Sequence, residues 1–471
     1  MKTNDVKRVG IASPVVPPWS SSDMESIVED ALRVLERIGV ACSQAAAVRR
    51  LLEQGGVEHR NGRLYFAAAP TREAVRSHRY TGPMEPDDRQ LSMGGSWACL
   101  QYCDPQTGAV RPGTTAEAVA MARLWESRGY GGAPPLQPGD VSPRLITLAC
   151  ERIGLLHSRA LGGSMTVTDP QEVRFLIDMN LAAGRRYTLA EQVSISPLKF
   201  DDTGLETALM FLDNPDVRVQ IWGAIPMAGA TCPLDPRSAV VQSVAEAIAH
   251  DRLCQALGLG SGGMSLRVEP FDFQYAFIVF GSPEWCLYRV LVQQLQEFLD
   301  GRPSRGGMFR SVSKRPDAQA ACERTASVLW QAMLGVRRFG AVGQLSVDEV
   351  FSPQQAVIDR EILGYVQRLV RGHDLGSSPD PLALISEGVA ENSFIGVDDT
   401  VQRFREFYDF PKLFRHWTLG RWSAEGQPSL LQEAWQHAQA EIAGSSFSLP
   451  HGQEREVERL YAKAVTYVQR S

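Results

Sequence analysis

The feature that most constrains how this chain folds is a repeated order of elements, in which a short apolar run precedes a longer helical segment about eight times. Strands that alternate with helices predict a parallel sheet covered by helices. Eight such units fit a closed TIM (β/α)8 barrel better than an open, doubly wound sheet. The runs and the helices that follow them are 96–102 with 114–128, 130–136 with 142–154, 156–164 with 170–183, 187–195 with 204–213, 217–225 with 236–256, 256–261 with 282–299, 305–310 with 316–335, and 338–345 with 353–371.

Several of these predicted helices open with residues that commonly cap helix N-termini. The starts are Thr114-Thr115 before Glu117, Asp169-Pro170 before Glu172, Ser282-Pro283 before Glu284, and Ser352-Pro353. Nearer the N-terminus, Ser22 and Glu25 have the spacing of a capping box ahead of an amphipathic stripe, which Gly39 can terminate. A helix is therefore predicted between these residues.

The pattern divides the chain into three parts. Residues 1–92 are predicted to form a helical N-terminal extension with one short strand at 63–66. Residues 93–374 are predicted to form the barrel. Residues 375–471 form a mostly helical C-terminal region, with a polar last helix from about 453 to 470, which we expect to cover part of the barrel.

Composition excludes several classes of protein. The 48 Lys and Arg residues stand against 54 Asp and Glu residues, and the arginines form no basic stripe of the kind that binds nucleic acid or anionic membranes. The first ten residues lack the apolar core of a secretory signal, and no window has the length of a transmembrane helix. The eight cysteines are widely spread. We expect reduced thiols and a cytoplasmic location.

Short motifs support no common cofactor or metal site. Gly258-x-Gly260-x-x-Gly263 matches the dinucleotide fingerprint as a string, but it runs toward Pro270 and opens no helix. A glycine-lined strand end where a ligand comes close is the favoured interpretation. The Cys99-x3-Cys103 pair has no partner pair at zinc-finger spacing. Neither a nucleophile elbow nor a P-loop is present.

Aromatic side chains lie near the predicted C-terminal ends of strands, where TIM barrels assemble their active sites. They are Tyr102, Tyr130, Trp222, Phe309 and Phe351. Converging rings can hold a methylated ammonium by cation–π attraction of ~0.5–2 kcal/mol each, although ordinary packing is the alternative for every one of them. The carboxylates at strand ends are Asp104, Asp140, Asp201, Asp202 and Glu349, and the pattern does not select a glycosidase pair among them.

The order and spacing of several further stretches resemble the trimethylamine methyltransferase (MttB-type) superfamily. The stretches are 31–40 (ALRVLERIGV), 51–56 (LLEQGG), 104–115 (DPQTGAVRPGTT), 194–198 (SISPL), 227–234 (MAGATCPL), 281–284 (GSPE), 351–353 (FSP), 398–406 (DDTVQRFRE) and 421–422 (RW). The resemblance extends from about residue 23 to 465. The chain departs from the family pattern at 258–268, where a glycine-rich run replaces a Gly-Ala-Pro stretch.

The resemblance implies a TIM barrel that moves a methyl group from a methylated amine to the cobalt of a corrinoid, a cobalamin carried by a separate partner protein. It also implies a homo-oligomer. The family's founding members use pyrrolysine for trimethylamine, whereas some relatives without it act on quaternary amines such as glycine betaine. This chain contains only the twenty ordinary residues. A quaternary ammonium leaves as a neutral amine without proton transfer, so no acid–base dyad is required.

From the resemblance and the strand ends together, we predict a substrate pocket, and we assign no catalytic residue and no metal site. The predicted pocket residues are Gln101, Tyr102, Trp222, Met227, Thr231, Ser261, Met264, Phe309, Arg310, Gln344 and Glu349. If the substrate is a betaine, Arg310 is the candidate for its carboxylate, and a surface ion pair is the alternative role.

Two other functions fit the sequence. One is a paralogue that keeps the barrel but only binds a small amine, another ligand or the corrinoid protein. The other is a barrel enzyme of different chemistry, such as a hydrolase or lyase that uses Asp140 or Glu349.

Overall fold

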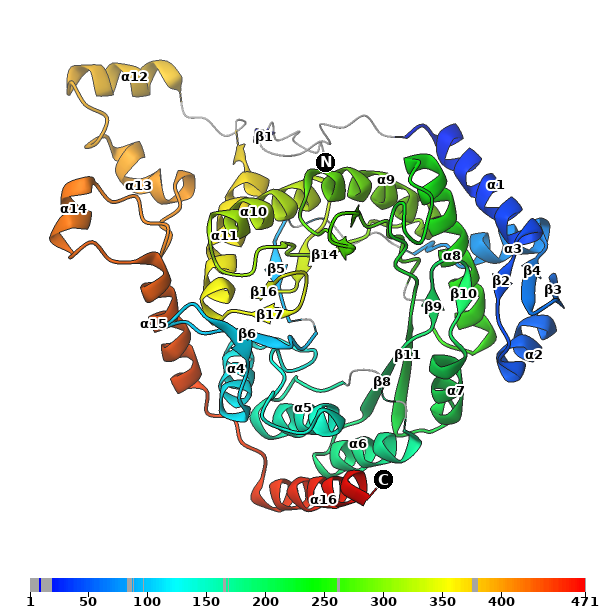
Figure 1. The fold of residues 1–471 in the computed structure, drawn as a ribbon. Helices are drawn as coiled ribbons and strands as arrows, with labels where there is room; N and C mark the ends of the chain where they lie inside the picture. Colours follow the sequence, from blue (N-terminus) through cyan, green and yellow to red (C-terminus); the bar gives the residue numbers. More distant parts are fainter. Residues whose placement is uncertain are drawn as a thin grey trace.

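The computed structural model describes residues 8–9, 19–82, 87, 89–95, 97–163, 167, 169–260, 263–374 and 380–470. The chain is a mixed α/β protein, about half of it helical. Figure 1 shows helices α4 to α11 arranged as a ring around short strands. The ring helices are α4 (Thr115–Arg128), α5 (Ile146–His157), α6 (Pro170–Ala182), α7 (Asp202–Phe211), α8 (Pro236–Ala256), α9 (Pro283–Asp300), α10 (Ala318–Met333) and α11 (Pro353–Arg371).

All eight predicted helices are present, and their ends lie within four residues of the predicted ends. The four predicted capping residues are confirmed, because Thr114, Asp169, Ser282 and Ser352 each accept a hydrogen bond from a backbone N–H of the first turn. Capping depends on residues only a few positions apart, so these helix starts could be predicted from the sequence alone.

The strands pair in several short ladders. They are β5 (Ser92–Met93), β6 (Gln101–Cys103), β7 (Val110–Pro112), β8 (Tyr187–Gln192), β11 (Val217–Trp222), β12 (Phe271–Asp272), β13 (Phe277–Ile278), β14 (Gly306–Met308), β15 (Arg338–Gly340), β16 (Gln344–Leu345) and β17 (Val350–Phe351). β8 pairs with β11 in parallel over six residues, and β14, β15 and β5 form a second parallel ladder. A third ladder, with both parallel and antiparallel pairs, has the order β16-β17-β6-β7.

Isolated parallel bridges extend this pattern. Cys99 pairs with Leu136, Gly132 with Leu161, and Met227 with Glu269. The β15–β5 pair joins the last unit of the ring to the first. Among the described residues the strands thus form separate ladders rather than one continuous closed sheet.

Two strand predictions were wrong. The run 256–261 begins with the last residue of α8 and its C-cap, Leu257, and the strand bridge of that unit lies further on, at Glu269. The run 156–164 begins inside α5, which continues through His157. Short apolar runs do not distinguish a strand from the buried face of a helix, and both errors arose there.

The N-terminal part contains helices α1 (Ser21–Arg37), α2 (Ala45–Glu53) and α3 (Ala68–Ser77), but it is not purely helical. Strands β2 (Val40–Ala41), β3 (Val57–Arg60) and β4 (Arg63–Phe66) join β10 (Lys199–Phe200) and β9 (Ser194–Ile195) in a five-stranded sheet. Asn61 and Gly62, both with positive φ, form the β3–β4 turn. Asn-Gly between apolar runs is a strong hairpin signal, and the sequence prediction missed it.

The capping box of α1 is formed by Ser20 and Asp23 rather than by Ser22 and Glu25. Neighbouring serines offer the same side chain at alternative positions, so the pattern identified the helix but misplaced its start by two residues. Gly39 follows the helix at φ +69°, as predicted, and a Cβ there would lie 2.4 Å from the carbonyl oxygen of Leu64.

The C-terminal part is mostly helical, as predicted. Its helices are α12 (Pro381–Ala390), α13 (Asp398–Phe407), α14 (Leu419–Ala424), α15 (Leu430–Gly444) and α16 (His451–Arg470), and β18 (His373–Asp374) pairs with β1 (Arg8–Val9). α15 packs on α4 and α11, and α16 packs on α5 and α6. Helices α12–α14 lie outside the ring (Figure 1).

Three large apolar clusters around the ring, with two smaller ones at Leu345 and Trp285, make up the core of the described residues. One lies under α1, α2 and α8, a second under α4, α10, α11 and α15, and a third between α5, α6, β8 and α16. All eight cysteines are free thiols. No helix in the described part of the chain is both long and apolar enough to cross a membrane.

Candidate functional site

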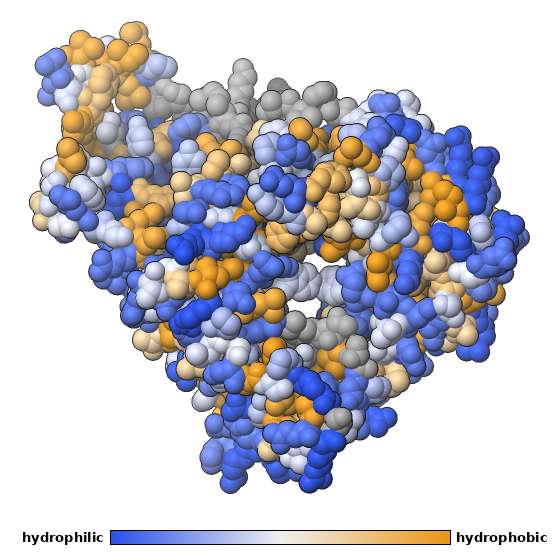
Figure 2. Space-filling view, in the orientation of Figure 1, coloured by the Kyte–Doolittle hydropathy of each residue, from blue (hydrophilic) through white to orange (hydrophobic). Residues whose placement is uncertain are grey.

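A cavity of about 880 Å³ lies alongside β8, β11 and α8. In the space-filling view the molecule is hollowed near the centre of the ring (Figure 2). Because side chains of a strand alternate between its faces, Arg218, Gln220 and Trp222 of β11 share one face. Ala190 and Gln192 lie opposite Gln220 and Trp222 in the β8–β11 register, and all five residues line the cavity. The ladder therefore presents a polar and aromatic wall, to which Val219 and Ile221 at the alternate positions of β11 also contribute.

Two tryptophans form the aromatic part of the wall. The rings of Trp97 and Trp222 meet edge to face, with centroids 5.5 Å apart. Each side chain is more than a third exposed, although both line the cavity. Gln192 fixes the loops after both strands, because its Nε2 donates to the carbonyl oxygens of Ser194 and Gly223 at 2.7 and 2.9 Å.

Three arginines line the same cavity, namely Arg218, Arg267 and Arg310. None of their guanidinium groups has a hydrogen bond or ion pair within the described residues. Arg310 is 6% exposed, and its guanidinium lies 3.9 Å from the ring centroid of Phe280. Burial lowers the pKa of Arg310 to about 10, and the negative charge of Glu269 opposes that shift. A buried cation with free donors is costly unless an anion joins it.

Charged groups of both signs surround Arg310. Glu269 interacts electrostatically with Arg310, Arg289 and Arg267, and burial raises its pKa. Asp348 also lines the cavity, and its pKa is raised by burial and lowered by Arg310. Neither carboxyl group forms an ion pair with Arg310 within the described residues, so an anionic group of a ligand could bond directly to its guanidinium.

The cavity wall offers little acid–base chemistry near neutral pH. His250 lines the cavity, and burial lowers its pKa to about 4. Its Nδ1 lies 2.8 Å from Oγ of Ser194. Burial raises the pKa of the Cys254 thiol to about 12. In the part of the chain that the structure describes, no cluster of three His, Cys, Asp or Glu side chains is arranged to hold a metal ion.

The structure brings part of the predicted pocket together. Trp222, Met264 and Arg310 line the cavity. Gln344 lies next to it, because its Nε2 donates to the carbonyl oxygen of Trp97 at 2.6 Å. Ser261 lies outside the described residues.

The other predicted residues do not line this cavity. Gln101 donates its backbone N–H to the carbonyl oxygen of Glu349 in the β6–β17 ladder, at 2.8 Å. Tyr102 is buried beneath Arg111, whose guanidinium lies 5.5 Å from the ring centroid. Oε2 of Glu349 accepts a hydrogen bond from the hydroxyl of Ser346. Contact of Gln101, Tyr102 and Glu349 with a substrate stays a prediction.

Met227, Thr231 and Phe309 also lie off the cavity wall. The Thr231 hydroxyl accepts a hydrogen bond from the backbone N–H of Met227 at 2.8 Å, which closes a turn. Phe309 is buried against Phe339, with ring centroids 6.0 Å apart. These three residues stay predicted substrate contacts.

Most of the other candidates named from the sequence have packing or capping roles. Tyr130 and Phe351 pack edge to face on Trp125. Asp140 accepts hydrogen bonds from the backbone N–H and hydroxyl of Thr115 at the start of α4. Asp104 forms an ion pair with Arg111, and Asp201 caps the N-terminus of α7. Asp202 accepts hydrogen bonds from Ser43. These contacts give no support to a hydrolase or lyase that uses Asp140.

The glycine-rich run lies where a ligand would approach. Gly260 and Gly263 line the cavity, and Gly263 adopts φ +95° beside the carboxylate of Asp300. That carboxylate accepts a hydrogen bond from the backbone N–H of Met264 at 2.8 Å. No helix begins between Gly263 and Pro270, so the run lacks the helix start of a dinucleotide-binding motif.

Sequence reasoning missed several residues of the wall. Trp97, Gln192, Arg218, Gln220, Arg267 and Asp348 line the cavity and were not predicted. For Arg218 and Gln220 a signal existed, because both share the period of two with Trp222 inside a predicted strand. For Arg267 and Asp348 no such signal existed, since they lie on irregular segments.

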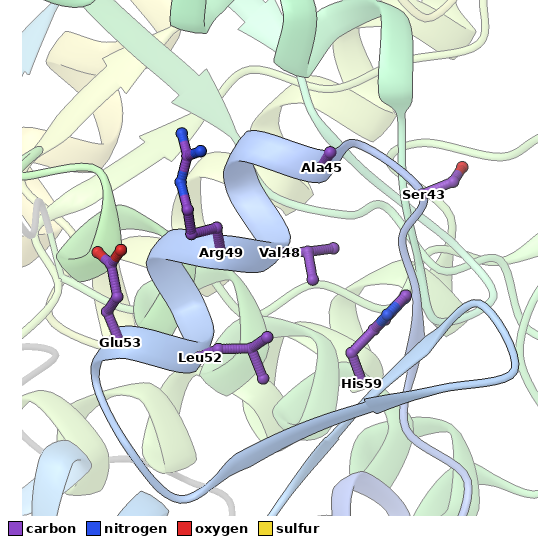
Figure 3. A pocket seen from close by; sticks show the side chains of 7 residues that line it. All are labelled: Ser43, Ala45, Val48, Arg49, Leu52, Glu53 and His59. Carbon is purple, nitrogen blue, oxygen red and sulfur yellow. The ribbon is translucent and has the colours of Figure 1, made fainter.

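A second depression, of about 530 Å³, lies on α2 and β3, away from the ring. In Figure 3, Arg49 and Glu53 lie at the opposite end of it from Ser43 and His59. The polar groups at the latter end are already bonded, Ser43 to Asp202 and His59 to the carbonyl oxygen of Cys42. The larger cavity, with its free guanidinium groups, is therefore the better candidate site.

Comparisons with known proteins match nearly the whole chain to one family. The family model described as trimethylamine methyltransferase (MTTB) matches residues 2–462. The trimethylamine methyltransferase MttB of Methanosarcina thermophila is 28% identical over 210 residues, which are 44% of this chain and 43% of that protein. Its Methanosarcina barkeri counterpart is 28% identical over 214 residues, 44% of this chain and 42% of that protein.

A bacterial relative matches over a longer stretch. The trimethylamine methyltransferase MttB of Desulfitobacterium hafniense is 23% identical over 355 residues, which are 72% of this chain and 70% of that protein. The chain thus spans less than half the length of the Methanosarcina relatives, although the family model covers it almost from end to end.

Proposed function

Because the chain belongs to the trimethylamine methyltransferase family, we propose that it moves a methyl group from a methylated amine to the cobalt of a corrinoid carried by a partner protein. We further propose that the amine is quaternary and carries a carboxylate, as a betaine does. The observation that carries this choice is the guanidinium of Arg310, which is buried on the cavity wall and has no hydrogen-bonding partner among the described residues.

A substrate carboxylate supplies the anionic partner that the guanidinium of Arg310 lacks among the described residues. Arginine presents two parallel N–H donors to a carboxylate, and such charge-assisted pairs are strong and directional. Arg267, on the same wall, adds positive potential. Trimethylamine and choline have no carboxylate, so neither would satisfy the buried guanidinium.

The ammonium end of the substrate is assigned to Trp97 and Trp222. Aromatic faces attract a methylated ammonium by ~0.5–2 kcal/mol each. Positive charge declines at nitrogen as the methyl group departs, so a carboxylate bound there would stabilise the ground state more than the transition state. Neutral rings oppose the reaction less, and they suit this step better.

The residues of this chain bind and orient the substrate rather than exchange protons with it. A quaternary amine leaves without a proton, which agrees with the low pKa of His250 and the high pKa of Cys254. Holding the substrate in line for transfer can remove up to ~7–11 kcal/mol of the barrier. The docked corrinoid supplies the cobalt nucleophile that accepts the methyl group. Because Trp97 and Trp222 are partly exposed, a methyl group bound against their rings would be accessible to the docked corrinoid.

We propose that the ring is a closed (β/α)8 barrel over about 93–374, flanked by the N-terminal extension 1–92 and the C-terminal region 375–471. The parallel pairs and bridges between successive units support this arrangement, above all the β15–β5 pair between the last unit and the first. β5 begins at Ser92, so the boundary passes through a strand. We also propose a cytoplasmic location and a homo-oligomeric state.

The test mixes the full chain with a Co(I) corrinoid protein and follows the change to the methyl-Co(III) spectrum. The panel is glycine betaine, dimethylglycine, choline and trimethylamine, which separates the quaternary centre from the carboxylate. We expect methyl transfer from glycine betaine and none from trimethylamine. Arg310→Lys, which keeps the charge but loses the bidentate fork, should lower the rate with glycine betaine.

Each other outcome changes the assignment. Equal rates with choline and glycine betaine would show that the carboxylate is not recognised. Calorimetric binding of glycine betaine without any transfer would favour the ligand-binding paralogue. No binding and no transfer across the panel would remove the proposal.

A further inference from the structure

Helices α12, α13 and α14, with the loops between them, form an arm that spans residues 381–424. Figure 1 shows this C-terminal arm outside the ring, beyond α11 and α15. None of its helices makes an extensive contact with another helix or strand. The loop before α14 is anchored to the ring, because Leu413 is buried in the cluster under α11 and α15 and its backbone N–H donates to Glu361. Of the three helices, α12 has no comparable anchor within the described residues.

The arm exposes large apolar side chains. Leu382, Ile385 and Val389 of α12 are 73%, 55% and 68% exposed, and their spacing places them on one stripe of the helix. Ile395, in the following loop, is 83% exposed. Further side chains at least half exposed are Phe394, Val401, Tyr408, Phe410 and Leu419. Figure 2 shows hydrophobic surface gathered over α12 at the upper left.

Such helices are not stable by themselves. α12 and α13 have ten residues each, and isolated helices shorter than about 12–15 residues are marginal in water. The only buried residue within α12 is Gly388, which packs against Phe394, and α13 and α14 contain none. The apolar stripe of α12 is therefore left without a covering surface from the described part of this single chain.

We propose that the covering surface is the same arm of a second copy of this chain, related by a two-fold axis, with the two α12 stripes packed on each other. An apolar stripe is complementary to itself, and a two-fold interface requires that property. The nine side chains expose on the order of 1,000 Å² of apolar surface, which compares with about 800 Å² per partner in a standard interface.

The position of the arm favours a second copy over the corrinoid protein. In Figure 1 the arm lies on the opposite side of the ring from β8, β11 and α8, which border the cavity. A partner that must reach the cavity would have little use for the arm as its main contact. The dimer does not depend on the proposed methyl transfer, since it rests on the exposed stripe alone.

The test measures the molar mass of the full chain by size-exclusion chromatography with light scattering, over a range of micromolar concentrations. We expect a mass of twice 51.8 kDa for the natural chain. The double variant Ile385→Asp/Val389→Asp buries two charges in the stripe and should weaken self-association at least about tenfold. Leu287→Asp places the same charge on a similarly exposed leucine of α9 and should leave the dimer unchanged.

A cross-link locates the interface directly. In the background Cys322→Ser, which removes the exposed native thiol, Ile385→Cys should form a disulfide between copies when copper phenanthroline and oxygen oxidise the two thiols. A monomeric natural chain, or a dimer that Ile385→Asp/Val389→Asp leaves intact and Ile385→Cys does not cross-link, would overturn the proposal. Loss of corrinoid-protein binding in the Asp variant, without any change in mass, would assign the arm to that partner instead.

Discussion

Two buried arginines of the same strand–helix unit, Arg310 just after β14 and Arg324 on α10, show how this molecule separates structure from function. Arg324 is fully buried, and its guanidinium donates to both carboxylate oxygens of Asp359 and to the carbonyl oxygens of Ala341 and Gln344. Arg310 is almost as buried, but its guanidinium has no such partner within the described residues. Both lie over phenylalanine rings. The difference is therefore in hydrogen bonding and not in burial.

The comparison extends to the carboxylates. Asp359 also accepts hydrogen bonds from Nε2 of Gln355 and the backbone N–H of Gly343, at 2.9 and 2.7 Å. Glu191 of β8 is as buried, yet neither of its oxygens has a well-formed hydrogen bond among the described residues, although the Val167 backbone N–H lies near enough to lower its pKa. A satisfied buried charge fixes the fold, whereas an unsatisfied one is available to a ligand or a proton.

The largest effect is expected at the satisfied pair. Arg324→Met should lower the free energy of unfolding by about 3–5 kcal/mol, because it leaves the carboxylate of Asp359 buried without its cation. Denaturant unfolding measures this loss. The double variant Arg324→Met/Asp359→Leu should recover part of it. A loss below about 1 kcal/mol would mean that the pair is not structural, and the comparison would fail.

Arg310→Met should show the reverse profile. We expect kcat/KM for glycine betaine to fall about 100-fold, which corresponds to about 2.7 kcal/mol, since a charged hydrogen-bonding pair to the substrate is lost. Stability should change far less than in Arg324→Met, because no hydrogen bond of the protein is broken. Steady-state kinetics and the same unfolding experiment give both quantities. A stability loss equal to that of Arg324→Met would make Arg310 structural.

The lack of hydrogen bonds to the Glu191 carboxyl group should appear in the pH dependence of the free energy of unfolding. Burial raises its pKa from 4.5 to about 7, so between these values the folded protein holds a proton that the unfolded chain has released. The free energy of unfolding contributed by this group therefore falls as pH rises from about 4.5 to 7.

Glu191→Gln should remove that slope. We expect the variant to match the natural chain near pH 4 and to be more stable by up to about 2 kcal/mol at pH 8. Thermal melts across this range measure the difference. His250, whose pKa is lowered, contributes the opposite slope but is present in both proteins, so it cancels. Parallel pH profiles of the two proteins would show that Glu191 has a partner.

The smallest effect is expected at the aromatic wall. Trp222→Ala should raise KM for glycine betaine by about 3- to 20-fold, in line with ~0.5–2 kcal/mol of cation–π attraction, and Trp222→Phe should retain most of the binding. Initial-rate measurements over a substrate series give the change. If Phe and Ala behave alike, the ring does not hold the ammonium, and the betaine would be oriented by its carboxylate alone.

Local signals in the sequence predicted the helices well and the strands less well. α11 begins and ends where predicted, since Ser352-Pro353 starts it and Gly372 follows it. Strands of two or three residues, such as β14 and β15, form only where a strand far along the chain pairs with them. Their first and last residues therefore cannot be predicted from the apolar run alone. The prediction of strand 256–261 failed for a different reason, because that run begins with the end of α8.

The candidate site was predicted only in part. Trp222, Met264 and Arg310 lie on the cavity wall, but Arg267 and Asp348 come from irregular segments. No spacing rule links residues 97 and 222, whose rings touch in the folded protein. The alternation of side chains along β11 could have predicted Arg218 as a wall residue, because this alternation depends only on neighbouring positions in the sequence.

The sequence by itself determined the order of helices, their caps and the composition, because these depend on neighbours a few residues apart. The tertiary structure alone decided which charges remain unsatisfied. A guanidinium is free or bonded according to what the rest of the chain brings within about 3 Å of it. Arg310 and Arg324 are only fourteen positions apart in sequence, and packing at long range gives one of them an aspartate and leaves the other open to a ligand.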